Sequence, residues 1–190
     1  GEAVGSQDQI WAAYGGLNKI EFRKDGKFSI SPLIMGEQNY SSLENSLMLF
    51  FTGFSRVAPL IAQKKIDNFR NKAEELNMLS TLASSAASAL QDKNYDIKKI
   101  GELIHEAWLL KRELAEGVTT KEIDEIYKEG LQAGALGGKI LGAGGGGFIL
   151  FVVPPENQSS LEKRLSKLVH VKFNFDSAGS NIVVFEPEDE

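Results

Sequence analysis

The stretch GGKILGAGGGGFILFVV, residues 137–153, joins a glycine-rich run to a continuous apolar segment. Seven of the eleven residues 137–147 are glycine, and ordering so many glycines costs considerable chain entropy. Such a run is useful where backbone must approach another group closely or adopt positive φ. The apolar segment 148–153 predicts a buried strand. Two interpretations stay open: a tight connection that packs backbone against backbone, or a loop that faces a ligand.

The glycine-rich run matches neither of the two common nucleotide-binding motifs in its context. Gly142, Gly144 and Gly147 have the spacing of the dinucleotide fingerprint, but a strand follows them where that motif requires a helix. A phosphate-loop alignment fails because Ala133 stands at its first glycine and Ile140 at its Ser/Thr position.

Outward from this stretch, hydrophobic periodicity predicts strands at both ends of the chain and helices between them. Residues 6–14 form a helix that Ser6 and Gln9 begin as a capping box. Strands over 17–23 and 27–32 are expected to form a hairpin, and a buried strand is expected over 47–52. An apolar helical stripe runs from Ala62 to Leu90, with a possible break at 78–80. Two further helices are expected, one over 97–114 and one from Thr119, which forms a capping box with Glu122, to near Gly134.

The last part of the chain predicts strand, helix, strand and strand on one sheet. Beyond the strand at 148–153 we expect a helix begun by Ser159 and Glu162, a strand over 171–175, a turn over 176–180 and a strand over 182–185. This order is a split βαβ arrangement, so the predicted fold class is α+β: a ferredoxin-like antiparallel sheet with a helical layer.

Composition excludes several classes of protein. The 21 basic and 26 acidic residues leave a net charge of −5, which argues against a nucleic-acid partner. The absence of cysteine excludes disulfides and thiolate metal sites, and two histidines argue against a multi-histidine zinc site. The longest apolar runs, 47–51 and 148–153, are too short to span a membrane, so the expected compartment is the cytoplasm.

Three stretches together carry a resemblance to a known family: Gln7-Asp8-Gln9 leading to Ala12-Ala13-Tyr14-Gly15-Gly16, then His105-Glu106-x-Trp108-x-x-Lys111, and the glycine-rich run before a buried strand. The chain resembles the C-terminal part of a GHMP-family small-molecule kinase over essentially its whole length. Within that family it most resembles the kinases of D-glycero-D-manno-heptose 7-phosphate, and Thr52-Gly53-x-Ser55-Arg56 fits the same group.

The family's ATP-phosphate loop, Pro-x-x-x-Gly-Leu-Gly-Ser-Ser at a helix start, has no match in this sequence. The resemblance therefore implies a chain that starts inside the N-terminal kinase domain. Residues 1–36 are expected to be the remnant of that domain, and residues 37–190 the C-terminal domain. The remnant should expose an apolar face around Trp11, Ile20 and Phe22, which the missing half covers and which promotes self-association.

The resemblance also implies roles for particular residues. Asp8 matches the catalytic aspartate; the alternative is an acid that the helix dipole favours. Arg56, with Ser55, is expected to hold the substrate's distal phosphate; the alternative is a surface arginine. Trp108 and Lys111 are neighbours on one helix and would contact the sugar phosphate; the alternatives are a core tryptophan and a lysine without that role, and His105 is interpreted as a satisfied helix residue. The glycines expected beside the substrate and the ATP phosphates are Gly142, Gly144, Gly145, Gly146 and Gly147.

The implied activity is transfer of the ATP γ-phosphate to a hydroxyl, the anomeric one, of a heptose phosphate, with Mg²⁺ bridging the ATP phosphates. No metal ligand is predicted in this chain, and the chain alone is expected to be inactive. Two alternatives stay open: a non-catalytic sugar-phosphate-binding or regulatory module, and one subunit of a split kinase.

Overall fold

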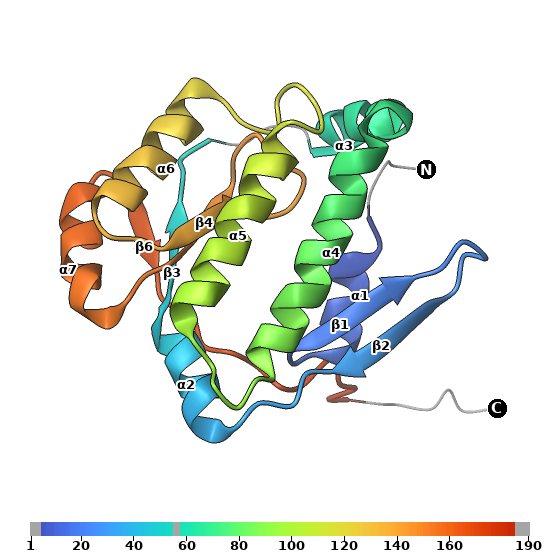
Figure 1. Cartoon of the computed structure of the whole chain (residues 1–190), viewed down its shortest axis with the longest axis horizontal. Helices are drawn as coiled ribbons and strands as arrows, with labels where there is room; N and C mark the ends of the chain where they lie inside the picture. The colour runs from blue at the N-terminus through green and yellow to red at the C-terminus, as the bar shows by residue number, and fades with distance from the viewer. Residues whose placement is uncertain (1–4, 55–57, 185–190) are drawn as a thin grey trace. The chain divides into compact units, whose positions relative to one another are not determined.

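A computed structural model describes residues 5–54 and 58–184 (Figure 1). The described chain divides into two compact units. The larger unit comprises residues 35–54 and 58–173, and the smaller unit comprises residues 5–34 together with 174–184. The C-terminal segment therefore belongs with the N-terminal elements, and the proposed kinase-domain boundary between residues 36 and 37 stays a prediction.

The smaller unit consists of a helix, a hairpin and the returning C-terminal segment. Helix α1 spans Gln7–Tyr14, and strands β1 (Asn18–Phe22) and β2 (Phe28–Pro32) pair antiparallel, as predicted. The backbone N–H of Gly16 donates to Asp176 O at 3.0 Å, and that of Ser180 donates to Ala12 O at 2.9 Å. Of the three residues expected on an exposed apolar face, Trp11 and Phe22 are 53% and 56% exposed, whereas Ile20 is half-buried.

Two predictions in this unit are wrong. Ser6 has helical φ and ψ and its side chain makes no capping hydrogen bond, so there is no capping box. Residues 182–184 form no strand, and their exposed fractions of 74–92% show that no neighbouring layer buries them. In the larger unit, the strand expected over 171–175 is found instead over Val169–Val171, as β6.

The larger unit is built on a four-stranded sheet in the order β4–β5–β3–β6, with every neighbouring pair antiparallel. Along the chain β3 precedes five helical segments, β4 and β5 follow, and α7 leads to β6. This order confirms the ferredoxin-like α+β fold, and it adds one strand, β4, that the sequence analysis did not predict. The strands are β3 (Leu47–Phe51), β4 (Gly137–Ile140), β5 (Phe148–Val152) and β6 (Val169–Val171).

The helices of the larger unit are α2 (Glu37–Asn45), α3 (Ala58–Asn68), a 3₁₀ turn (Phe69–Lys72), α4 (Ala73–Leu90), α5 (Ile97–Arg112), α6 (Lys121–Gln132) and α7 (Pro155–Arg164). Three of them correct the sequence analysis. Helix α2 was missed because it buries only Leu43, which leaves no periodic pattern. The long stripe breaks at 69–72 rather than 78–80. Helix α7 begins at Pro155, a favoured first helical residue, rather than at Ser159.

The core lies between the sheet and helices α5, α6 and α7, and α5 runs beside β4 with α4 next to it (Figure 1). Tyr127 of α6 stacks on Phe151 of β5, with ring centroids 6.0 Å apart. Gly130 allows this approach, since a Cβ there would lie 2.3 Å from the Phe151 ring. Full burial of each such side chain stabilises the fold by about 1.5–3 kcal/mol.

Candidate functional site

The glycine loop, residues 141–147, connects β4 to β5 and has a backbone that only glycine adopts without strain. Its five glycines have φ values of 65°, 110°, 77°, 149° and 85° in chain order. An L-residue at such φ places its Cβ too close to its own backbone, which costs about 1–2 kcal/mol per residue. The glycine composition is therefore a requirement of the loop's shape.

Two turns hold the loop by backbone contacts. The Gly145 N–H donates to Val118 O at 2.9 Å, and a Cβ on Gly144 would lie 2.7 Å from the same oxygen. On the other side, the Gly147 N–H donates to Phe54 O at 2.8 Å. A Cβ on Gly146 would lie 2.6 Å from that oxygen. The loop is thus wedged between backbone on both sides, which supports the packing interpretation of the glycine run.

Thr52 closes the end of the loop, and sequence analysis gave it no individual role. Its backbone N–H and its side-chain hydroxyl both donate to Gly147 O, each at 2.9 Å. Thr52 is buried directly after β3, and its side-chain bond to Gly147 is partly buried. The one sequence signal for this role is that Thr52 is a polar residue directly after the apolar run 47–51.

Lys111 anchors the start of the loop. Its Nζ donates to Gly142 O at 2.8 Å and to Ile140 O at 3.2 Å. Lys111 lies in the last turn of α5, where the helix carbonyls also favour a cation. The lysine expected to contact a sugar phosphate therefore holds loop carbonyls, and its contact with substrate stays a prediction.

Trp108 lies in the core, so the prediction of an aromatic platform for the substrate is wrong. Its side chain is 0% exposed, and its ring centroid lies 6.1 Å from that of Tyr127. The i, i+3 spacing to Lys111 leaves an angular offset of about 60° on a helix, which suffices to place one residue in the core and the other at the loop.

His105 is a satisfied helix residue, as interpreted from sequence. Its Nδ1 lies 2.6 Å from the hydroxyl of Tyr127, and the two rings stack. Burial raises the pKa of Tyr127 to about 12, so the phenol keeps its proton and can donate it to His105. The pair stabilises the contact between α5 and α6 in the core.

The predicted roles of Asp8, Ser55 and Arg56 are not tested by the described contacts. Asp8 is exposed in the first turn of α1, in the smaller unit. Ser55 and Arg56 lie outside the described residues. The roles of all three stay predictions.

Lys139 is a residue that sequence analysis missed, and its position inside the glycine-rich run is the signal that could have found it. It lies on β4 opposite Leu150, and burial lowers the pKa of its amine. Within residues 5–54 and 58–184, its ammonium has no hydrogen-bond or ion-pair partner. It is therefore a half-buried cation whose charged form is disfavoured.

The described part of the chain also has a groove between α4 and α5, with a volume of about 520 Å³. None of the predicted site residues lines it. Its lining residues are Asn77, Met78, Thr81, Leu82, Glu106, Leu109 and Leu110.

Among the described residues, no group of three or more His, Cys, Asp or Glu side chains could hold a metal ion. In the same part of the chain, no helix combines the length and apolarity needed to cross a membrane.

Comparison with known proteins adds the family to this geometry. Residues 86–170 match the family model described as GHMP kinases C terminal. This stretch contains α5, α6, β4, the glycine loop, β5 and α7, so this part of the chain resembles the C-terminal domain of the GHMP kinase family.

Several named relatives are similar beyond that domain. The chain is 31% identical over 167 residues to a D-glycero-alpha-D-manno-heptose 7-phosphate kinase of Campylobacter jejuni, covering 86% of this chain and 48% of that protein. It is 31% identical over 161 residues to a mevalonate kinase of Thermococcus sibiricus, covering 81% and 44%. A solved D-glycero-D-manno-heptose 1-phosphate kinase of Bacteroides thetaiotaomicron superposes with a TM-score of 0.68 at 26% identity, covering 92% and 47%. The chain thus spans about half the length of these relatives.

Proposed function

We propose that this chain is the C-terminal portion of an ATP-dependent sugar kinase that transfers the γ-phosphate to the anomeric hydroxyl of a heptose phosphate. The observation that carries the proposal is the glycine loop: five positive-φ glycines, fixed between two turns, follow β4 in a GHMP kinase C-terminal domain. The substrate class is inferred from the heptose phosphate kinases among the relatives.

The glycine loop would act through its backbone. Gly145 and Gly147 donate their N–H groups to protein carbonyls, whereas those of Gly144 and Gly146 find no acceptor among the described residues. Backbone N–H groups in a turn with positive φ suit phosphate oxygens, because they present fixed partial positive charge. We therefore assign Gly144 and Gly146 to the phosphates of the sugar or of ATP.

Three other residues complete the proposed site. Asp8 would position the acceptor hydroxyl and take its proton, while Arg56 and Ser55 would hold the distal phosphate of the sugar. Mg²⁺, when bound with ATP, neutralises charge that develops on the transferred phosphoryl group. By resemblance to the family, the phosphate-binding loop and the metal ligands would come from an N-terminal half.

The test has to distinguish this proposal from two alternatives, a different acceptor and a different role for the chain. The similarity to a mevalonate kinase favours mevalonate as the second acceptor to examine. A chain without the phosphate-binding loop could also be a sugar-phosphate-binding module or one subunit of a split kinase.

The test is ADP release with Mg-ATP and either heptose 7-phosphate or mevalonate as acceptor, with heptose 1-phosphate, whose anomeric hydroxyl already carries phosphate, as the negative control. It is measured on the 190-residue chain alone and on a polypeptide that joins it to a half bearing the phosphate-binding loop. We expect turnover only in the joined polypeptide and a preference for heptose 7-phosphate. Preference for mevalonate would overturn the substrate class, and turnover by the chain alone would overturn its dependence on a second half.

A further inference from the structure

The connection between α5 and α6, residues 113–120, provides one wall of the glycine loop. Val118 is completely buried, and its carbonyl accepts the Gly145 N–H at 2.9 Å. Gly144 packs so closely on Val118 that a Cβ would lie 2.9 Å from the Val118 Cα. The glycines have no side chains that could compensate for a shift, so the position of Val118 sets the position of this half of the loop.

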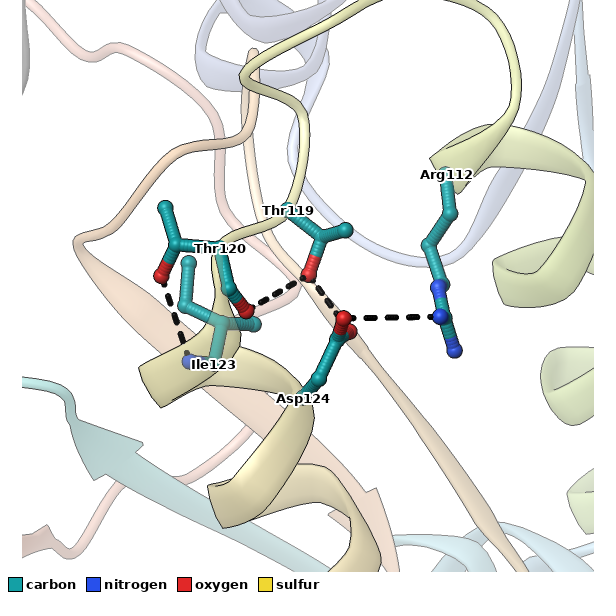
Figure 2. A network of polar contacts seen from close by, with 5 residues as sticks. All are labelled: Arg112, Thr119, Thr120, Ile123 and Asp124. Carbon is teal, nitrogen blue, oxygen red and sulfur yellow. Dashed lines mark hydrogen bonds and ion pairs between the residues drawn. The ribbon is translucent and has the colours of Figure 1, made fainter.

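Figure 2 shows what fixes the residue that follows Val118. The Thr119 hydroxyl donates to Asp124 Oδ1 at 2.7 Å, and Asp124 Oδ2 lies 3.5 Å from Arg112 Nη2. Thr119 and Arg112 stand at opposite ends of the α5–α6 connection, so the Asp124 carboxylate links both ends. This bridging is what a single carboxylate with two oxygens can do and an apolar residue cannot.

The side-chain cap of α6 uses a different hydroxyl from this link. Thr120, and not Thr119 as the sequence pattern suggested, begins the helix, because its Oγ1 accepts the Ile123 N–H at 3.3 Å (Figure 2). The Thr119 hydroxyl makes its short contact with Asp124 Oδ1 at 2.7 Å and a longer one, 3.5 Å, with Thr120 O (Figure 2). The capping bond uses the Thr120 hydroxyl and the link uses the Thr119 hydroxyl, so the two can be removed by different substitutions.

The last turn of α5 therefore reaches the glycine loop by two routes. Lys111 binds the Gly142 carbonyl directly, and its neighbour Arg112 acts through Asp124, Thr119 and Val118. The Arg112–Asp124 pair is partly exposed, with side chains 32% and 36% accessible, so it adds little to global stability. Its effect is on geometry.

We propose that Asp124 is a positioning residue for the glycine loop, acting through Thr119 and Val118 with Arg112 as its anchor. The statement about loop geometry is independent of the reaction; its consequence for phosphate transfer rests on the proposed function. No other described carboxylate bonds Thr119.

The experiment follows the backbone amides of Gly144–Gly147 by ¹⁵N NMR and hydrogen exchange in the full chain. Asp124→Ala is expected to shift these amides and to raise exchange at Gly145 about tenfold, the weakening expected when one hydrogen bond loses its support. Asp124→Asn keeps an acceptor for Thr119 and should restore most of the wild-type shifts. Glu125→Ala, on an exposed neighbour, should leave the glycine amides unchanged.

Thr119→Val removes the hydroxyl while the Thr120 cap remains, and it should shift the same glycine amides as Asp124→Ala. It tests the proposal independently if Asp124→Ala folds poorly. If Asp124→Ala and Thr119→Val move only α6 amides such as Ile123 and leave Gly144–Gly147 unmoved, the proposal is overturned. This readout needs neither ATP nor sugar, so a failed kinase assay would count against the proposed function alone.

Discussion

The glycine loop and the hairpin of the smaller unit both turn on glycines with positive φ, yet they use them differently. Gly26 in the hairpin has a φ of 80°, and nothing lies within 4 Å of the Cβ it lacks. Gly144 and Gly146 combine positive φ with backbone oxygens less than 3 Å from that position. The hairpin needs glycine only for its conformation, whereas the loop also needs it for close packing. A loop fixed in this way can present N–H groups at set positions, which is what the proposed site requires.

The largest expected effect is on kcat, and it concerns Asp8, the proposed catalytic side chain of the smaller unit, rather than the backbone of the glycine loop. In the active, joined polypeptide, Asp8→Asn is expected to lower kcat by about 10²–10⁴, because a positioned acid–base group is lost. The exposed side chain should contribute little to stability, so Tm and the glycine amide shifts should not change. Turnover within a few-fold of wild type would make Asp8 an ordinary helix-terminal acid.

Within the loop, the next largest effect is expected for Gly144→Ala. Overpacking against Val118 and φ strain together should cost about 3 kcal/mol or more of unfolding free energy, measured by denaturant titration. Gly142→Ala is the matched control, since its φ is 65° but nothing lies within 4 Å; we expect about 1–2 kcal/mol there and at Gly26. Equal losses at Gly144 and Gly142 would contradict the distinction between conformation and packing.

The Lys111 anchor should have a smaller effect that is confined to one end of the loop. Lys111→Met keeps most of the stem but loses both carbonyl contacts, at a cost of about 1.5 kcal/mol for a partly exposed charged donor. Amide exchange at Gly142 and its neighbours should rise. Lys98→Met, on an exposed position of the same helix, should change neither quantity. A loop unaffected by Lys111→Met would mean that the two turns suffice to hold it.

The smallest effect concerns Lys139, beside the loop on β4. Because burial lowers the amine's pKa below its ordinary value of 10.5, the unfolded chain binds more protons at pH values approaching 10.5. The free energy of unfolding should therefore gain a rising contribution over that alkaline interval. Lys139→Met should remove this rise and stabilise the protein at neutral pH by about 1 kcal/mol, unlike exposed Lys163→Met. Denaturant midpoints measured at several pH values test this, and an alkaline rise that persists in Lys139→Met would contradict the assignment to Lys139.

The sequence predicted the parts of the fold that rest on strong apolar periodicity. The apolar strands β3 and β5, the hairpin, and helices α5 and α6 were found because one face of each is consistently apolar or continuously buried. Strand β4 was missed because Gly137 and Gly138 are typical of a loop. In the structure they are strand residues whose missing side chains allow a close approach, of α5 to Gly137 and of the Phe151 ring to Gly138. The stripe from Ala62 to Leu90 looked like core but buries fully only Ala87 among the described side chains.

The candidate site was predictable only in part, because its contacts are mostly backbone contacts. The glycine loop was identified from its composition, whereas Lys111 was expected to contact the sugar phosphate and binds loop carbonyls instead. Val118 could not be found because its role depends on its backbone carbonyl, which every residue has. Asp124 could not be found because its role depends on a hydrogen bond to Thr119 that only the folded turn brings about. Trp108 was misassigned because an i, i+3 spacing does not say where a helix passes from core to surface.

The central claim is that the glycine loop is held by packing and also faces phosphate. The most direct measurement is titration of the ¹⁵N-labelled chain with heptose 7-phosphate, ATP and inorganic phosphate to tens of millimolar, following glycine amides. We predict saturable shifts at Gly144 and Gly146, with Gly26 unmoved and with inorganic phosphate weaker than the sugar phosphate. Unmoved amides at Gly144 and Gly146 throughout the titration would show that the loop is only a packed connection and would contradict the proposed site.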